Sequence, residues 1–369
     1  MLFEIPEGTK DFLPGEAKWK KEIEDVVAKE LKSWGYRQVI TPSYEYLTTL
    51  SQGAKSSSDF FSFFSENGES IALRNDFTTP IARLSGIALV DEIRPLRLYY
   101  VGNLFRLKRK EKSREFWQAG AELIGDLSVK ADAEILALAM SLLDELGIRN
   151  WGLDIGHRGI LSGILEDSNL NTKAKVKAEA LLLKKDYVGL KELVEKEKSG
   201  YDLLLLPSLR GKEDIINTAY KRLTSKKAKE ALRDIENILE ALKPYGCTQI
   251  NIDLAMVKDL SYYTGMFFEC FVPGLAGAIC TGGRYDGLLA NFSHDEPAVG
   301  FAIGIDEVLE VLSQNKKRPE DIPDLGLVYT PETYTQAVLI AKEKRQQGLS
   351  VFLVKAGKEF PKAKEYKNV

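Results

Sequence analysis

Residues 94–125 read RPLRLYYVGNLFRLKRKEKSREFWQAGAELIG, an extended apolar run followed by a strongly charged stretch. The run is rich in Leu, Tyr and Val, which favours a β-strand, and the charges after it are typical of a turn. Residues 62–76, SFFSENGESIALRND, are built similarly around an Asn-Gly pair, which favours a tight hairpin turn. Both segments therefore predict antiparallel hairpins.

Helical patterns lie on either side of these hairpins. Residues 17–34 place apolar side chains at helical spacing, and Gly35 favours a stop after them. Residues 129–147, VKADAEILALAMSLLDELG, form an amphipathic pattern that ends in a glycine. Residues 36–47 are extended but contain Pro42, which cannot donate a ladder hydrogen bond, so we expect an edge or interface strand there.

The second half of the chain changes character twice. Residues 165–245 are Lys- and Leu-rich with helical periodicity, and paired strands resume after them. Beyond Pro323 a strand, a helix and a strand open a βαβ unit. We therefore predict an α+β fold, in which a mixed, largely antiparallel sheet is flanked by helices. Its predicted parts are a core in residues 1–164 and 246–322, a helical insertion in 165–245 and a small or incomplete α/β segment in 323–369.

Composition argues against a polyanionic partner. With 369 residues, 44% hydrophobic and 28% charged, the chain can bury a large core. Its 51 Lys and Arg residues stand against 54 Asp and Glu, a net charge of -3. Because no chain-wide positive field attracts phosphates, we do not expect nucleic acid as a partner.

Neither a membrane span nor a metal site is expected. No run of about 18 apolar residues occurs, and the start MLFEIPEGTKDFLPG lacks a basic and apolar leader, so we expect a cytoplasmic protein. The three cysteines show no paired CxxC spacing, and His157 and His294 are far apart in sequence. We therefore expect no metal and no cofactor.

Several segments share the order of one family's motifs. They are PEGTKDFLP (6–14), TPSYEY (41–46), LRNDFTTPIARL (73–84), FRLKRKEKSREFWQAGAELIG (105–125), SYYTGMFFE (261–269), GGRYDGL (282–288) and PAVGFAIGIDEVL (297–309). Together they resemble histidyl-tRNA synthetase, a class II aminoacyl-tRNA synthetase, over about residues 5–312. The resemblance implies a class II synthetase-like core, with the segment around Pro42 as a dimer-forming element.

The resemblance also implies an amino-acid pocket. A carboxylate with hydroxyls and ring faces suits a cationic amine and an imidazole, so we expect L-histidine or a similar small ligand. The alternative for Asp76 is a helix N-cap before residues 78–84, and both roles can hold together. The predicted histidine-binding or regulatory residues are Asp76, Thr78, Arg106, Gln118, Glu122, Tyr262, Tyr263, Arg284 and Tyr285.

Three departures from the family argue against catalysis. Activating an amino acid places charge on phosphoryl oxygens, which fixed cations must meet. Arg106 keeps one family arginine, but Lys108 stands at the family's neighbouring acidic position. Lys258 replaces a family arginine with a point charge, and Glu307 replaces another with a carboxylate that repels phosphate. We therefore predict no catalytic residues and no enzymatic activity of the chain itself.

A relative that keeps the scaffold but lacks these arginines resembles the regulatory subunits of ATP phosphoribosyltransferase. That resemblance implies a short-form catalytic subunit as partner, L-histidine as allosteric effector in the first step of histidine biosynthesis, and a homodimer within a hetero-octamer. Two alternatives stay open: an active histidyl-tRNA synthetase, and a stand-alone pseudo-synthetase that senses an amino acid. Co-purification of a short phosphoribosyltransferase chain distinguishes the regulatory reading from the sensor.

The basic run in residues 106–114 has three interpretations. It carries six cations and one acid in nine residues. A solvated hairpin tip is the simplest, because charged loops commonly serve only that role. Nucleotide binding and docking onto an acidic partner surface are the others.

Overall fold

The computed structural model describes residues 3–53, 59–107, 113–247, 249–257, 263–292, 295–315, 319–358 and 361–369. Lys108, Lys258, Tyr262 and His294 therefore lie outside the described residues. The chain divides into two compact units, residues 1–11 with 22–316 and residues 12–21 with 317–369.

The hairpin predicted in residues 94–125 lies within a large sheet. Strand β5 (Leu96–Phe105) pairs antiparallel with β6 (Glu115–Ile124) along its full length. Among the described residues this sheet has nine strands, six of its pairings antiparallel and two parallel. Their spatial order is β1 (Arg37–Gln38), β5, β6, β12 (Ala298–Gly304), β11 (Cys280–Arg284), β10 (Met266–Phe271), β7 (Gly152–His157), β9 (Ile250–Asp253) and β8 (Arg210–Gly211). The predicted mixed, largely antiparallel sheet is confirmed.

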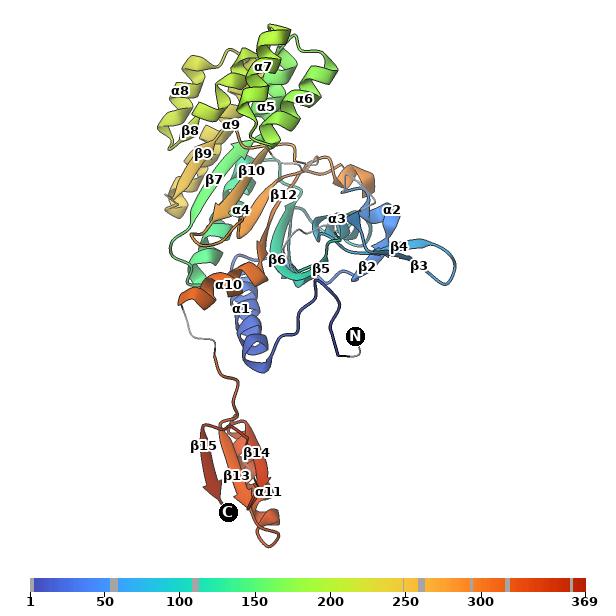
Figure 1. Ribbon diagram of the computed structural model, residues 1–369, viewed down its shortest axis with the longest axis vertical. Helices are drawn as coiled ribbons and strands as arrows, with labels where there is room; N and C mark the ends of the chain where they lie inside the picture. The colour runs from blue at the N-terminus through green and yellow to red at the C-terminus, as the bar shows by residue number, and fades with distance from the viewer. Residues whose placement is uncertain are drawn as a thin grey trace. The chain divides into compact units, whose positions relative to one another are not determined.

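Helices cover one face of this sheet (Figure 1). Helix α4 (Val129–Glu145) contacts β6, β11 and β12, and α9 (Lys226–Leu242) contacts β7 and α4. The amphipathic pattern of α4 explains its place, since its apolar residues are buried and Gly147 after it adopts a φ of 78°. The other helices before and after the central strands are α1 (Pro14–Ser33), α2 (Leu47–Leu50), α3 (Thr78–Ile87), α10 (Ile305–Asn315) and the short η5 (Leu289–Phe292).

Helices also fill the stretch between β7 and β9, where Figure 1 shows them gathered beyond one end of the sheet. Asn171, Asp186 and Ser225 each accept a backbone N–H at a helix start, as expected for these N-cap residue types. The predicted domain boundaries, 165–245 included, stay predictions. The elements are α5 (Arg158–Asp167), α6 (Thr172–Leu183), α7 (Tyr187–Glu197), η2 (Tyr201–Leu204), η3 (Leu206–Ser208), α8 (Asp214–Arg222), α9 and η4 (Lys243–Tyr245).

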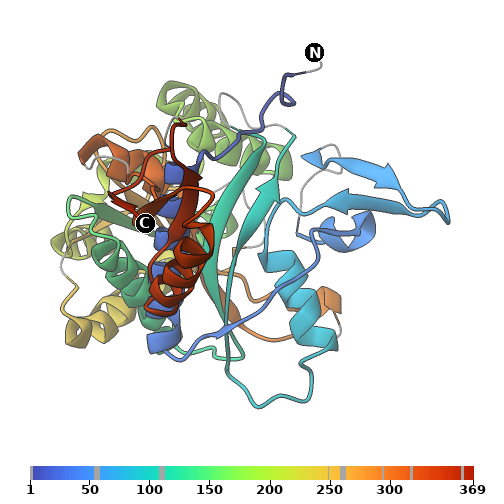
Figure 2. The same ribbon diagram turned by 90° about the horizontal axis from the view of Figure 1, so that it is seen from below.

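The extended run around Pro42 lies at sheet edges, as predicted, but it is divided into two strands. Instead of one edge strand it forms two short ones in different sheets: β1, parallel to β5, and β2 (Tyr44–Tyr46), antiparallel to β4 (Ser70–Leu73). Pro42 lies between them, where a residue without an N–H ends one ladder before the next begins. The hairpin predicted in 62–76 is confirmed as β3 (Ser62–Phe64) and β4, which extend away from β5 and β6 in Figure 2.

The C-terminal unit contains the predicted strand, helix and strand. They are β13 (Leu325–Tyr329), α11 (Tyr334–Gln346) and β14 (Val351–Lys355), with the two strands parallel. The sequence prediction missed β15 (Glu365–Asn368), which also pairs parallel with β13. Its residues EYKN are polar and mostly exposed, so they carry no apolar run to indicate a strand.

Across the part of the chain that the structure describes, no helix combines the length and apolar character needed to cross a membrane.

Candidate functional site

Glu122 lies at the centre of the predicted pocket. Strand β6 carries its side chain on the sheet face opposite α4, and it is only 2% exposed. Thr78, at the start of α3, donates its hydroxyl hydrogen to Oε1 at 2.9 Å. The Tyr285 hydroxyl, just after β11, donates to Oε2. The structure thus brings three predicted residues from three distant segments into direct contact.

The environment of Glu122 places its ionisation near neutrality. Burial raises the pKa of this carboxyl to about 7, because a charged form loses hydration there. The hydrogen bonds from Tyr285 and Thr78 favour the ionised form and lower the pKa, whereas the neighbouring Asp76 raises it. A small cationic ligand beside Glu122 would favour its ionised form further.

Asp76 has the capping role that its sequence context predicts, although it lies one residue before Phe77, the N-cap position of α3. Its Oδ1 accepts the Thr79 backbone N–H at 2.7 Å, which satisfies a donor in the first turn of α3. Burial raises the pKa of Asp76, while the bonds from Thr79 and the charge of Arg106 oppose that rise. The cap orients the helix start that presents Thr78 to Glu122, and a ligand-binding role for Asp76 stays a prediction.

Glycines on the neighbouring strands make room for these side chains. Gly300 of β12 is the register partner of Glu122, and a Cβ there would collide with the Glu122 carboxylate. Gly283 of β11 is the next partner across, and a Cβ there would lie 2.7 Å from the Tyr263 ring. Sequence reasoning did not single out these two positions, although the pair Gly282-Gly283 in GGRYDGL is the signal that indicates a close approach.

The two predicted tyrosines of residues 261–269 cannot both be placed. Tyr262 lies outside the described residues. Tyr263 is 7% exposed, stacks on Phe267 with ring centroids 5.9 Å apart, and lies over Gly283. It therefore lies beside Glu122, Gly300 and Gly283, which are aligned across three neighbouring strands.

Gln118 and Arg106 lie farther along the same hairpin. Gln118 Oε1 is 3.5 Å from the Tyr100 hydroxyl, a long hydrogen bond, and Tyr100 stacks on Phe77 at 4.1 Å. Arg106 is exposed; its Nε donates to the Asn75 carbonyl at 3.0 Å and its guanidinium lies over the Phe116 ring. Most of the basic run after Arg106 lies outside the described residues, so its three interpretations stay open.

Arg284 does not join this group. Although it precedes Tyr285, its Nε donates to Asp132 of α4 at 2.9 Å, on the opposite face of the sheet. Its side chain is almost fully buried there. Its contribution to the histidine pocket stays a prediction, and its contacts with α4 indicate a different kind of role.

Glu307 packs within the first turn of α10. It is 7% exposed, and its carboxylate lies against Gly304, where a Cβ would collide with it. Its neighbour Asp306 accepts the Trp117 backbone N–H at 2.7 Å. Two acidic residues at a helix N-terminus are stabilising, because they oppose the positive end of the helix dipole.

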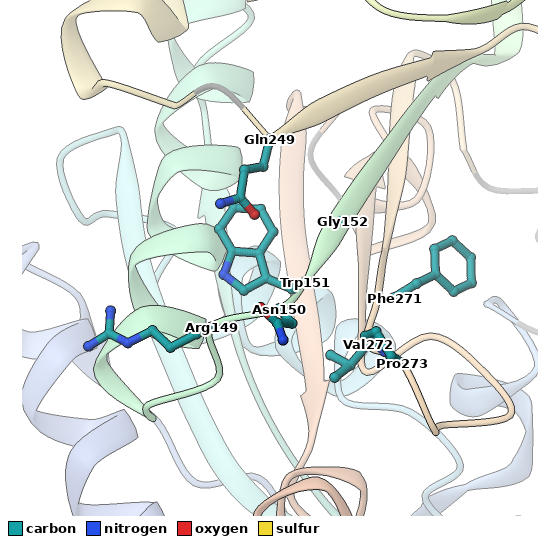
Figure 3. Close-up of a pocket in the computed structure, with 8 residues that line it drawn as sticks. All are labelled: Arg149, Asn150, Trp151, Gly152, Gln249, Phe271, Val272 and Pro273. Atoms are coloured by element: carbon teal, nitrogen blue, oxygen red, sulfur yellow. The ribbon is translucent and has the colours of Figure 1, made fainter.

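A separate concave region lies where β7 begins and β10 ends (Figure 3). This open pocket has a volume of about 560 Å³, and sequence reasoning did not predict it. In Figure 3 the Trp151 and Phe271 rings lie on either side of Gly152. Its lining residues are Arg149, Asn150, Trp151, Gly152, Gln249, Phe271, Val272 and Pro273.

The sequence is similar to proteins of two related kinds. A family model described as Histidyl-tRNA synthetase matches residues 8–308. An ATP phosphoribosyltransferase regulatory subunit from Bacillus pumilus is 36% identical over 360 residues, covering 95% of this chain and 91% of that protein. One of the same name from Acetivibrio thermocellus is 35% identical over 371 residues, covering 98% and 89%.

Solved structures share the fold. A crystal structure from Bacillus halodurans, described as an ATP phosphoribosyltransferase regulatory subunit/histidyl-tRNA synthetase, has a TM-score of 0.90 at 33% identity and covers 100% of this chain and 97% of that one. Histidyl-tRNA synthetase from Nostoc sp. PCC 7120 has a TM-score of 0.82 at 23% identity, covering 97% and 87%, which bears on the fold alone. The predicted class II synthetase-like core is confirmed.

Proposed function

Because the chain belongs to the histidyl-tRNA synthetase family and, within it, to the ATP phosphoribosyltransferase regulatory subunits, we propose that a short-form catalytic subunit requires it for activity and that L-histidine acts through it. The observation that carries the proposal is the 36% identity to a regulatory subunit over 95% of the chain. The proposed assembly is a homodimer that joins catalytic subunits in a hetero-octamer, in the cytoplasm, with no metal, cofactor or nucleic acid.

The cluster around Glu122 supports histidine as the effector. A buried carboxylate that titrates near neutrality can accept a hydrogen bond from a cationic amine or a protonated imidazole. The Tyr263 ring lies beside the same aligned residues and offers an apolar face to a small planar group. We therefore assign the regulatory pocket to Glu122, Thr78, Tyr285 and their neighbours.

The residues that depart from the synthetase pattern support a non-catalytic role. Lys108 and Lys258 alter the positions of phosphate-binding groups in the family. Glu307 adds a carboxylate where the family has a cation, and in the first turn of α10 this charge opposes the positive end of the helix dipole. In this proposal the chain keeps the synthetase scaffold for binding and lacks its chemistry.

The decisive experiment mixes the purified protein with a short-form catalytic subunit from the same organism and follows phosphoribosyl-ATP formation with and without histidine. We expect activity to appear on mixing and to fall when histidine is added. Glu122→Gln should keep the stimulation and lose most of the histidine response, whereas Glu230→Gln, an exposed acid on α9, should behave as wild type.

Each other outcome points elsewhere. Absent stimulation, with histidyl-adenylate formed by the protein alone, would identify an active synthetase. Histidine binding without any effect on a catalytic subunit would favour a stand-alone sensor. Unchanged histidine inhibition in Glu122→Gln would place the effector outside this pocket while leaving the regulatory role intact.

A further inference from the structure

Two neighbouring residues at the end of β11 reach opposite faces of the large sheet. Tyr285 donates its hydroxyl hydrogen to Glu122 on one face, and Arg284 donates to Asp132 of α4 on the other. Successive side chains of a strand alternate in this way, and the Tyr285 N–H continues the ladder by donating to the Ala298 carbonyl at 2.7 Å. One short stretch of backbone therefore carries both the contact with Asp132 and the contact with Glu122.

Arg284 is held from several directions at once. Its Nε donates to Asp132 Oδ1 at 2.9 Å, and its Nη2 donates to the Ser128 carbonyl at 3.3 Å. Its Nη1 donates to the Asp126 carbonyl at 3.2 Å and to Asp286 Oδ1 at 3.1 Å. These acceptors come from α4, from the loop that precedes it and from the residue after Tyr285. They occupy each nitrogen of the guanidinium, so Arg284 already has its partners within the protein.

Asp286 fixes the backbone on the other side of Tyr285. Its Oδ1 also accepts the Ala298 N–H at 3.0 Å, and its Oδ2 accepts the Thr264 hydroxyl at 3.2 Å. Residues on both sides of Tyr285 are therefore fixed, one to α4 and one to β12 and the segment before β10. Tyr285 lies between these two fixed residues, is itself only 2% exposed, and has its hydroxyl on Glu122.

We propose that Arg284 is a positioning residue, which anchors the end of β11 to α4 and thereby holds the Tyr285 hydroxyl on Glu122 across the sheet. The assignment of histidine to that pocket comes from the proposed function, and the anchor itself does not depend on it. The planar fork of Arg284 is essential to the anchor, because a lysine offers no fixed geometry for acceptors spread over three segments.

A double-mutant cycle in histidine affinity tests the proposal. We expect Arg284→Lys and Tyr285→Phe each to weaken calorimetric histidine binding about tenfold, and the double variant to be little weaker than either, because both remove one hydrogen bond at Glu122. Arg97→Lys is the matched control. Arg97 of β5 donates two hydrogen bonds to Glu134 of α4, at 2.7 and 2.8 Å, and neither bond involves Tyr285. This control variant should change the affinity less than about twofold.

A second readout needs no ligand. In carboxyl-labelled protein followed by nuclear magnetic resonance, we expect Arg284→Lys to raise the pKa of Glu122 as Tyr285→Phe does, because a donor that favours the ionised form is lost. Thr78 and Asp76 also face Glu122 and stay unchanged in both variants. Asp132→Asn weakens the same anchor from α4 and serves if Arg284→Lys does not fold.

The two readouts separate this inference from the proposed function. If the wild-type protein binds no histidine, the proposed effector is wrong, and the titration of Glu122 still decides the role of Arg284. An unchanged titration in both Arg284→Lys and Asp132→Asn, or independent and additive effects of Arg284→Lys and Tyr285→Phe, would overturn the positioning role.

Discussion

At the scale of single residues, Glu122 should make the stability of the protein depend on pH. Its pKa is raised from the ordinary 4.5 to about 7 by burial, so the folded state holds this proton more tightly than the unfolded chain. Its stabilising contribution is present below pH 4.5 and is lost as the pH rises through about 7, a change of about 3 kcal/mol. Glu122→Gln should remove that loss, as measured by urea unfolding at about pH 5 and about pH 8. Equal pH dependence in variant and wild type would contradict the prediction.

His157 should have the opposite effect. Burial and the charge of Arg284 lower its pKa from 6.5 to about 4, so the unfolded chain takes up the proton first as the pH falls. Stability from the neutral ring is present above pH 6.5 and is lost as the pH falls through about 4. His157→Asn keeps an acceptor for the Gly159 N–H but does not titrate. Between neutral pH and about pH 5, the free energy of unfolding should therefore fall by about 2 kcal/mol less in the variant than in wild type. An equal loss of unfolding free energy in wild type and variant between these two pH values would contradict the prediction.

Single residues also show which contacts at the candidate site the sequence indicates and which it does not. The sequence indicated a capping role for Asp76, and the resemblance grouped Thr78, Glu122 and Tyr285, which lie in contact, while their histidine-binding role stays a prediction. The sequence could not predict the face of the sheet toward which the Arg284 side chain points. Its partner Asp132 lies in a helix about 150 residues away, and no local pattern links the two. A strand alternates its faces, so adjacent motif residues need not share a site.

At the scale of elements, the sheet of β2, β4 and β3 should form a homodimer contact. Tyr44, Tyr46 and Phe63 lie on one face of it and are 56%, 51% and 44% exposed. Such an exposed group of aromatic side chains is typical of an interaction surface. We expect Tyr44→Glu to shift the protein from dimer to monomer in sedimentation equilibrium, because a charge buried in an interface is strongly unfavourable.

A matched control is available on the helical part. Tyr201, in η2, is also 56% exposed, so Tyr201→Glu tests the effect of an added charge at equal exposure away from this sheet. It should leave the dimer intact. A dimer that survives Tyr44→Glu and Phe63→Glu together would show that the copies meet elsewhere.

The elements differ in how clearly the sequence predicts them. Helix α4 and the hairpin of β3 and β4 follow directly from amphipathic spacing and an Asn-Gly turn. The division of the Pro42 run between two sheets depends on which partners accept each half, and β15 depends on the neighbouring β13. Both are set by tertiary pairing, which a single sequence does not display.

At the scale of the whole molecule, the proposed loss of synthetase chemistry from a synthetase scaffold predicts a clear negative result. Loss of one positioned cation costs about 3 kcal/mol of transition-state stabilisation, and Lys258 and Glu307 each alter one in the family pattern. We therefore expect the protein alone to show no histidine-dependent exchange of pyrophosphate into ATP, with an active histidyl-tRNA synthetase assayed in parallel as the positive control.

Reversing one departure should not restore the activity. Glu307 packs against Gly304 at the start of α10, so Glu307→Arg places a cation beside the positive end of the helix dipole and should destabilise the fold instead. We expect this variant to melt at a lower temperature and still to exchange no pyrophosphate. Pyrophosphate exchange above background that is abolished by Glu122→Gln would instead mean that the altered scaffold still activates histidine. The proposed separation of binding from catalysis would then be wrong.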